Sequence, residues 1–461
     1  MNGAITLDAL PPADNRPVLL LGFAAIGAAA GVLWMPVFVP LAIGAFVFIM
    51  SFRESELFFL LLIFLQPIDV VSFGIPAVSD ASLAVHALAV GGFFLGRLRR
   101  RQSQFGELFR QGNTRRSLLF LGCIALSAVS GIHGLAHEKI RGVYFVAVYF
   151  SFYLFAATWL ASAERRRKAL HALLASAVLV CLFAFVQVIT RSSTGLYTVM
   201  YEFSPQEWTR RPPSFLPGPN ALAGYLNLIL PFAIAVFLLS SESAWKRLSG
   251  AVMVIGSISL ILTQSRGGYI ASASTVIATI WHFARDYKKR VALLVMVALL
   301  AGASYAALLA WNPRHFGEFE EDHSTLARVI LWYTAWNVFL ASPVHGIGFG
   351  TFTFISGSYL PVIGDLPENL GVHNIYLELL AEAGVLGFMS FLALACTGIR
   401  RAWNQCRCGD WFQHAAGFGA AVGMTSMLVG GFVDHNVLWA PQIGLLYWFL
   451  LALSGATQQP S

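Results

Sequence analysis

Charged side chains are scarce in this sequence: they make up 11% of its 461 residues, whereas 57% of the residues are hydrophobic. A water-soluble chain of this length needs far more polar surface to cover its core, because soluble domains carry about 25% charged residues. The mean hydropathy of +0.68 also argues against a soluble fold. The composition therefore predicts an integral membrane protein.

Cysteine is rare as well, with five in the chain. Cys123, Cys181 and Cys396 lie inside or at the ends of apolar runs, whereas Cys406 and Cys408 lie in a basic loop, so no disulfide is predicted. The Cys406-Arg407-Cys408 stretch lacks the further ligands that a zinc ion requires. The sequence shows neither a carboxylate pair at metal-binding spacing in an apolar run nor a Gly-x-Ser-x-Gly elbow. We therefore predict no metal and no other cofactor.

Apolar runs long enough, or nearly so, to cross ~30 Å of hydrocarbon recur along the whole chain. They include residues 117–131, 142–162, 171–189, 221–239, 291–311 and 415–432. These runs are apolar on all sides, whereas the strands of a membrane barrel alternate between polar and apolar positions. The sequence thus predicts an all-α, polytopic transmembrane helical bundle of about 12 to 14 spans.

The limits of this bundle are less well defined. Runs 17–34 and 36–50 fit either two spans or a re-entrant pair. Residues 1–16 lack the basic start and the small-residue cleavage site of a signal peptide, so no removed leader is expected. We expect residues 1–461 to form a single membrane domain.

The net charge of +7 is better explained by membrane topology than by a nucleic-acid partner. Basic residues gather in short loops between apolar runs, within residues 97–116, 165–168, 246–247, 285–290 and 400–407. The positive-inside rule places these loops in the cytoplasm, together with both termini. It leaves two long segments outside: residues 191–218, and residues 312–373 with a helix that begins near Ser324 and lies at the membrane interface.

The basic residues that are predicted to lie outside are exceptions to this rule, so each of them requires an explanation. They are Lys139, Arg141, Arg191, Arg210, Arg211, Arg266, Arg314 and Arg328. Arg266 falls in a tight turn between two apolar runs, where a charge near hydrocarbon is costly without an anionic partner such as a diphosphate. Snorkelling of Arg266 to lipid headgroups is the alternative. Arg328 lies one helical turn before Trp332, which permits either a cation–π contact or a helix anchored at the membrane interface. Arg210 and Arg211 are weaker candidates, because a double arginine in an external loop is often only solvated.

His373 is the candidate general base. It stands at a predicted helix start, where the positive end of the helix dipole disfavours imidazolium and keeps the ring neutral. Glu378 and Glu382 follow on the same helix and either orient His373, pair with the arginines, or simply favour the first turns of the helix. The Gly346-Ile347-Gly348-Phe349-Gly350 stretch lacks a preceding strand and a following lysine, so it is read as a tight turn and not as a phosphate loop. Arginines facing an anion, with one neutral base, suit displacement of a diphosphate by a hydroxyl.

Four ordered stretches together resemble the bacterial O-antigen ligase and O-antigen polymerase superfamily. They are Pro217-Gly218-Pro219-Asn220-Ala221-Leu222-Ala223-Gly224-Tyr225, Thr263-Gln264-Ser265-Arg266-Gly267, Gly346-Ile347-Gly348-Phe349-Gly350-Thr351-Phe352, and His373-Asn374-Ile375-Tyr376-Leu377-Glu378 with Glu382-Ala383-Gly384. The resemblance covers about half of the chain. It does not extend to the region before Arg191 or to the C-terminal spans.

The resemblance implies a glycosyltransferase of the bacterial inner (cytoplasmic) membrane whose active site faces the periplasm. Its donor would be a glycan on undecaprenyl diphosphate, and the acceptor of an O-antigen ligase would be lipid A-core. By this likeness His373 is the base on the acceptor hydroxyl, while Arg266 and Arg328 hold the diphosphate. Arg210 or Arg211 would support them, and Asn220 and Glu378 would also contact substrate. An inverting reaction that needs neither metal nor nucleotide is implied as well.

Two alternatives remain from the sequence. The polymerase branch shares these motifs and differs in its acceptor, which is another lipid-linked repeat; the ligase is preferred because the long external segment lies late in the chain, just before His373. A transporter or flippase of lipid-linked glycans would instead carry basic residues along a path through the bilayer, whereas the basic residues here gather at one face.

Overall fold

The computed structural model of the chain describes residues 38–68, 81–100, 112–131, 136–190, 211–284, 286, 288, 323–356, 371–407 and 410–455. All regular elements among these residues are helices, which confirms the predicted all-α class. Five of the described helices are long and apolar enough to cross a membrane: α7 (Ala136–Trp159), α8 (Ala163–Thr190), α10 (Pro219–Leu239), α11 (Ser243–Leu262) and α17 (Ile375–Gln405). The prediction of a polytopic helical bundle is therefore confirmed. The runs 17–34 and 291–311 lie outside the described residues, so the number of spans stays a prediction.

Contacts divide the chain into two compact units, of which the first comprises residues 1–59 and 84–103. In it, α2 (Phe38–Phe52) packs against α4 (Ala81–Arg99), where Gly92 and Gly96 face the backbone of α2 so closely that a side chain would collide with it. Helix α3 (Glu56–Leu65) continues from this unit into the second one. All the described candidate site residues belong to the second unit.

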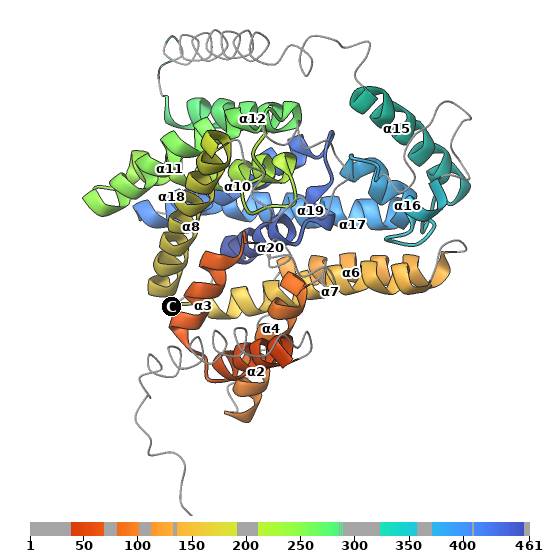
Figure 1. Ribbon diagram of the computed structural model, residues 1–461, viewed down its shortest axis with the longest axis horizontal. Coiled ribbons are helices and arrows are strands. Elements are labelled where there is room, and N and C mark those ends of the chain that lie inside the picture. The colour runs from red at the N-terminus through yellow and green to blue at the C-terminus, as the bar shows by residue number, and fades with distance from the viewer. Residues whose placement is uncertain are drawn as a thin grey trace, which may run out of the picture. The chain divides into compact units, whose positions relative to one another are not determined.

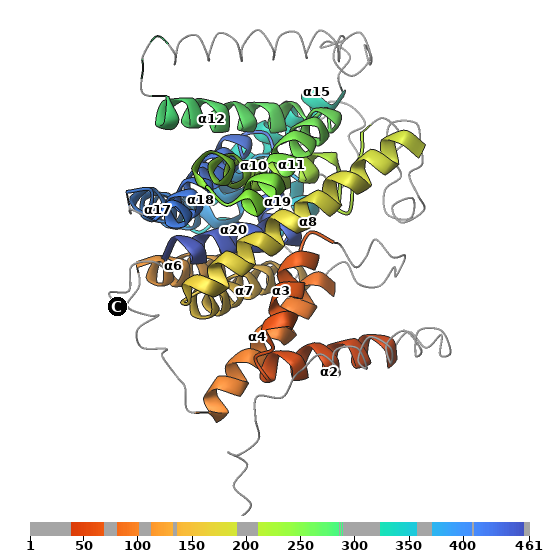
Figure 2. The ribbon, with the colours of Figure 1, turned by 90° about the vertical axis from the view of Figure 1, so that its left-hand side faces the viewer.

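The second unit is organised around α10. This helix is almost wholly buried and packs most extensively against α18 (Trp411–Gly430) and α11 (Figures 1 and 2). Gly419 of α18 gives the space that the buried ring of Phe232 fills. Helix α12 (Arg266–Phe283) lies over both α10 and α18, and Gly268 near its start packs against Ala223 near the start of α10.

A second group of helices in this unit lies next to α17. Helices α6 (Gly112–Ser130) and α7 run beside each other, α6 packs on α17, and α20 (Pro441–Gly455) packs on α7 (Figure 1). The last helix is buried along its whole length. Between α18 and α20 lies the short helix α19 (Asn436–Trp439), which brings residues 431–439 close to the start of α17.

Helix α17 is broken at Gly384, whose φ of 64° and ψ of −168° are non-helical. The break frees backbone groups that would otherwise bond within the helix. The amides of Val385 and Leu386 donate to the carbonyls of Pro343 and Val344 at 2.9 and 3.3 Å. Non-helical backbone is tolerated in a membrane protein where protein groups satisfy it in this way.

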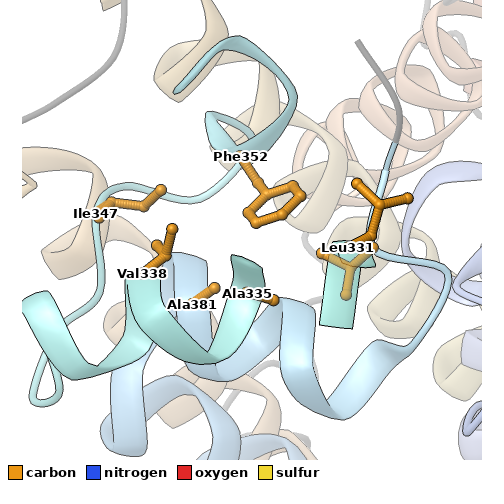
Figure 3. Packing of buried hydrophobic residues seen from close by; sticks show 7 residues of the cluster. Leu331, Ala335, Val338, Ile347, Phe352 and Ala381 are labelled. Atoms are coloured by element: carbon orange, nitrogen blue, oxygen red, sulfur yellow. The ribbon is translucent and has the colours of Figure 1, made fainter. Parts of the chain in front are cut away.

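Helix α15 (His323–Ala341) begins one residue before the predicted start at Ser324. Its inner face packs on the first half of α17, where Leu331, Ala335 and Val338 form a buried cluster with Ala381 (Figure 3). Phe352, from the short helix α16 (Phe352–Ile355), closes the cluster. Burial of this apolar surface fixes α15 beside the start of α17; whether α15 lies at the membrane interface stays a prediction.

Candidate functional site

The start of α17 holds His373 beside the end of α18. Asn374 caps α17, since its Oδ1 accepts hydrogen bonds from two amides of the first turn at 3.0 and 3.1 Å. Its Nδ2 donates to the carbonyl of Phe432 at 3.0 Å, and the amide of Ile375 donates to the carbonyl of Gly431 at 2.9 Å. The residue that follows His373 is therefore fixed by its own helix and by the neighbouring one.

His373 itself has a φ of 52°, in the left-handed region where residues other than glycine are uncommon. Such a conformation persists only where the surroundings impose it. Here the carbonyl of Val372 accepts a hydrogen bond from Trp332 Nε1 at 3.2 Å, while Asn374 holds the other side. The ring of His373 meets that of His435, with 4.6 Å between the centroids.

His435 is held by a buried carboxylate. Glu378 lies one turn into α17, and its Oε2 is 2.6 Å from His435 Nδ1. Its Oε1 accepts a hydrogen bond from Trp439 Nε1 at 2.7 Å. Trp439 stacks in turn on Phe349, with 5.0 Å between the centroids. Both oxygens of Glu378 thus contact protein groups, and its predicted contact with substrate stays a prediction.

The two histidines have opposite electrostatic surroundings. Burial lowers the pKa of His373 to about 3, with further lowering by the charges of His435 and Arg328. Burial also lowers the pKa of His435, but the charge and hydrogen bond of Glu378, followed by the charges of Asp434 and Glu382, outweigh it and raise that pKa above its ordinary value. His373 is consequently neutral, as a general base must be, and His435 favours the imidazolium form.

Arg211 is placed at the start of α10. Its Nε donates to the carbonyl of Thr263 at 2.9 Å, and its Nη2 donates to Asn220 Oδ1 at 3.1 Å. The planar guanidinium thereby joins the first turn of α10 to the turn that precedes α12. The structure thus brings two predicted site residues, Arg211 and Asn220, into direct contact, whereas Arg210 lies outside the described residues.

Arg266 is the first residue of α12. Ser265 caps this helix by accepting a hydrogen bond from the amide of Gly268 at 3.2 Å, and Gln264 takes a φ of 51° in the turn before it. Gly267 lies so close to Val433 that a side chain there would collide with it. The turn of Arg266 is therefore packed directly on the segment that carries Asp434 and His435.

A cavity of about 40 Å³ lies between the start of α12 and the segment around Asp434. Asn220 and Gly267 line it on the arginine side, and Ile375, Asp434 and Asn436 line it on the histidine side. Burial raises the pKa of Asp434 above its ordinary value, although His435, the backbone amides of Asn436 and His435 and the charge of Arg328 oppose this effect. A cavity of this size holds a few water-sized groups between the two halves of the site, and its lining is mostly apolar.

Arg328, on the first turns of α15, belongs to the histidine side. Its charge acts on both His373 and Asp434. The packing of α15 on α17 and the hydrogen bond from Trp332 to the carbonyl of Val372 fix the helix that carries it. Trp332 is therefore engaged with the backbone next to the candidate base.

The glycine-rich stretch is a tight turn, as predicted, with φ of 71° at Gly346, 117° at Gly348 and 89° at Gly350. Glu382 anchors it, because its two carboxylate oxygens accept from the amides of Gly350 and Phe352 at 2.9 and 2.8 Å. The amide of Gly348 donates to the backbone carbonyl of Glu382 at 3.0 Å. Glu382 thus supports the turn against which Trp439 and α7 pack.

Sequence reasoning found His373, Arg328 and Glu378, which the structure brings together, and Arg211, Asn220 and Arg266, which lie around the turn before α12. It missed Asp434, His435 and Trp439. The signal was present as a polar Asp434-His435-Asn436 stretch between two apolar runs, on the side predicted to be external.

The model of one protein family, described as O-Antigen ligase, matches residues 251–392. This segment includes Arg266, Arg328, His373 and Glu378, and it ends before His435. The match confirms the predicted relationship to the O-antigen ligase and polymerase superfamily and supports a membrane enzyme of that type. No curated protein matches the chain.

Proposed function

We propose that this protein transfers a glycan from undecaprenyl diphosphate to an acceptor hydroxyl at the periplasmic face of the inner membrane, as an O-antigen ligase that acts on lipid A-core. The observation that carries this proposal is the neutral imidazole of His373 in contact with His435, next to the turn of Arg266, which packs on Val433 and is joined to α10 by Arg211 and Asn220. One side of such a site accepts a proton and the other side holds an anion.

In the proposed reaction His373 takes the proton of the acceptor hydroxyl, and the hydroxyl oxygen attacks the anomeric carbon of the donor. The bond between that carbon and the diphosphate oxygen breaks, so undecaprenyl diphosphate leaves with the electron pair. Attack from the face opposite to the leaving group inverts the anomeric centre. Arg211, Arg266 and Arg328 stabilise the negative charge that grows on the diphosphate, so the proposal requires no metal.

The low pKa of His373, about 3, has a consequence for this reaction. A base that weak holds a proton poorly in the free protein, where His435 and Arg328 place positive charge near it. The donor diphosphate brings negative charge to the site and raises the affinity of His373 for the proton. Proton uptake is thereby favoured when a leaving group is bound.

The test is an assay with the purified protein, an undecaprenyl-diphosphate glycan and lipid A-core, in the presence of a metal chelator. A gel shift of the lipopolysaccharide that His373→Asn abolishes is the expected result. Asn suits the left-handed backbone better than Ala, so this variant separates loss of the ring from strain. Longer lipid-linked chains without a shift would make the enzyme a polymerase, and the absence of both products would overturn glycosyl transfer and favour transport.

A further inference from the structure

We propose that the Glu378–His435 pair is a positioning device for His373, which fixes the imidazole of the base and places one positive charge beside it. The inference rests on the proposed function and assigns a role to a histidine that lies beyond the segment matched by the family model. The evidence is the contact of the two rings, which lie 4.6 Å apart between centroids with their planes tilted by 47°, and the 2.6 Å contact of His435 with Glu378.

The ring of His435 is confined from several directions. Glu378 holds its Nδ1, and the backbone amide of His435 donates to its neighbour Asp434 Oδ1 at 2.6 Å. Gly371 leaves the space that the ring occupies, since a side chain at that position would collide with it. The His435 side chain is 15% exposed and Glu378 3% exposed. A ring so confined can hold a neighbouring ring in one orientation.

The charges around the pair determine what it does. Glu378 and Glu382 face His435 from α17, Asp434 lies beside it, and His373 and Arg328 complete the group. The carboxylates favour the protonated form of His435, whose charge then disfavours a second proton on His373. The pair therefore keeps the base free of a proton until an anion reaches the site.

Removing the charge of His435 has a predictable effect on the pH dependence of transfer. In His435→Gln the ring of His373 loses its charged neighbour, so it takes up a proton more readily. The acidic limb of the kcat profile should move to higher pH by about one to three units. Glu378→Gln should move it in the same direction, because His435 is then neutral at neutral pH. Since both variants remove the same charge, the double variant should shift the limb no further than the larger single shift.

The control is His137→Gln. His137 forms an analogous pair with Glu138, with Nδ1 3.1 Å from Oε1, but it is 83% exposed and belongs to α7. Its replacement should leave the pH profile of the wild-type protein unchanged. Apparent melting temperature and gel filtration in detergent show whether each variant is folded. If His435→Gln does not fold, Glu378→Gln provides an independent test.

An acidic limb that stays in place in the folded variants, with activity lowered equally at all pH values, would reduce His435 to a structural residue and overturn the inference. That outcome leaves the proposed function standing if wild-type protein transfers glycan and His373→Asn does not. Failure of wild-type protein to transfer glycan to any acceptor would overturn the proposed function itself. An upward shift in both single variants, without an additive double shift, establishes the pair.

Discussion

The break in α17 gives the most direct structural prediction, which is that Gly384→Ala is strongly destabilising. Gly384 has a φ of 64°, and a methyl group there would collide with the carbonyl oxygen of Val344. Alanine with this combination of positive φ and extended ψ, which essentially only glycine adopts, costs about 1–3 kcal/mol. Relief of the collision would separate Val344 from α17 and weaken buried hydrogen bonds across the break, each worth about 1–3 kcal/mol when a partner is lost. With one such hydrogen bond lost, the expected loss is therefore about 2–6 kcal/mol.

The assay is thermal unfolding in detergent, with glycan transfer measured on the same preparation. At about 2–4 °C per kcal/mol for a large domain, the apparent melting temperature should fall by at least about 4 °C. Transfer should also fall, because the first half of α17 carries Glu378 and Glu382. Gly122→Ala is the matched control: this helical glycine of α6 has open space around its Cβ position, so alanine should be neutral or slightly stabilising. Equal melting temperatures for the two variants would refute the reasoning about the break.

Further predictions concern the charged groups of the site. His373→Ala should insert into the membrane normally and transfer no glycan, and normal attachment in cells carrying this variant would remove its assignment as base. Arg266→Lys should lower transfer at least about tenfold, because lysine lacks the planar fork, whereas Arg247→Lys should be neutral; full activity of the first would indicate snorkelling. Glu382→Gln should lower the apparent melting temperature, since an amide accepts only one of the two backbone hydrogen bonds. The pKa of His373 is about 3 in the folded protein and about 6.5 in the unfolded chain, so the free energy of unfolding should fall as the pH drops below about 6.5. His373→Asn lacks this group and should lose less stability than the wild-type protein at pH 5. Equal losses of stability in the two proteins would contradict burial of a neutral ring.

Local sequence signals predicted the elements that carry the site. Asn374 and Ser265 both cap the helices that follow them, and such caps depend on a few neighbouring residues. The starts of α15 and α17 therefore agree with the sequence, whereas the start of α12 at Arg266 falls in a stretch that was predicted only as a tight turn. The break at Gly384 was not predicted, because glycine within a long apolar run is also compatible with a continuous helix. Only the packing of residues 343–350 against α17 shows why the helix must open there.

The partner of the base could not be found from sequence, because its identity depends on contacts between distant segments. His435 lies 57 residues from Glu378 along the chain, and the two meet since the amide of Ile375 bonds to the end of α18. From the sequence, Glu378 was expected to orient His373, to pair with the arginines or to favour the first turns of its helix, and the resemblance implied a contact with substrate. In the fold its oxygens contact His435 and Trp439. A buried carboxylate needs partners that satisfy its charge, and within the described chain the segment after α18 provides them. The contact between Glu378 and His435 could not be predicted from the sequence, and it places a charge beside His373. The chemistry of the base therefore depends on a part of the chain that carries no recognisable motif.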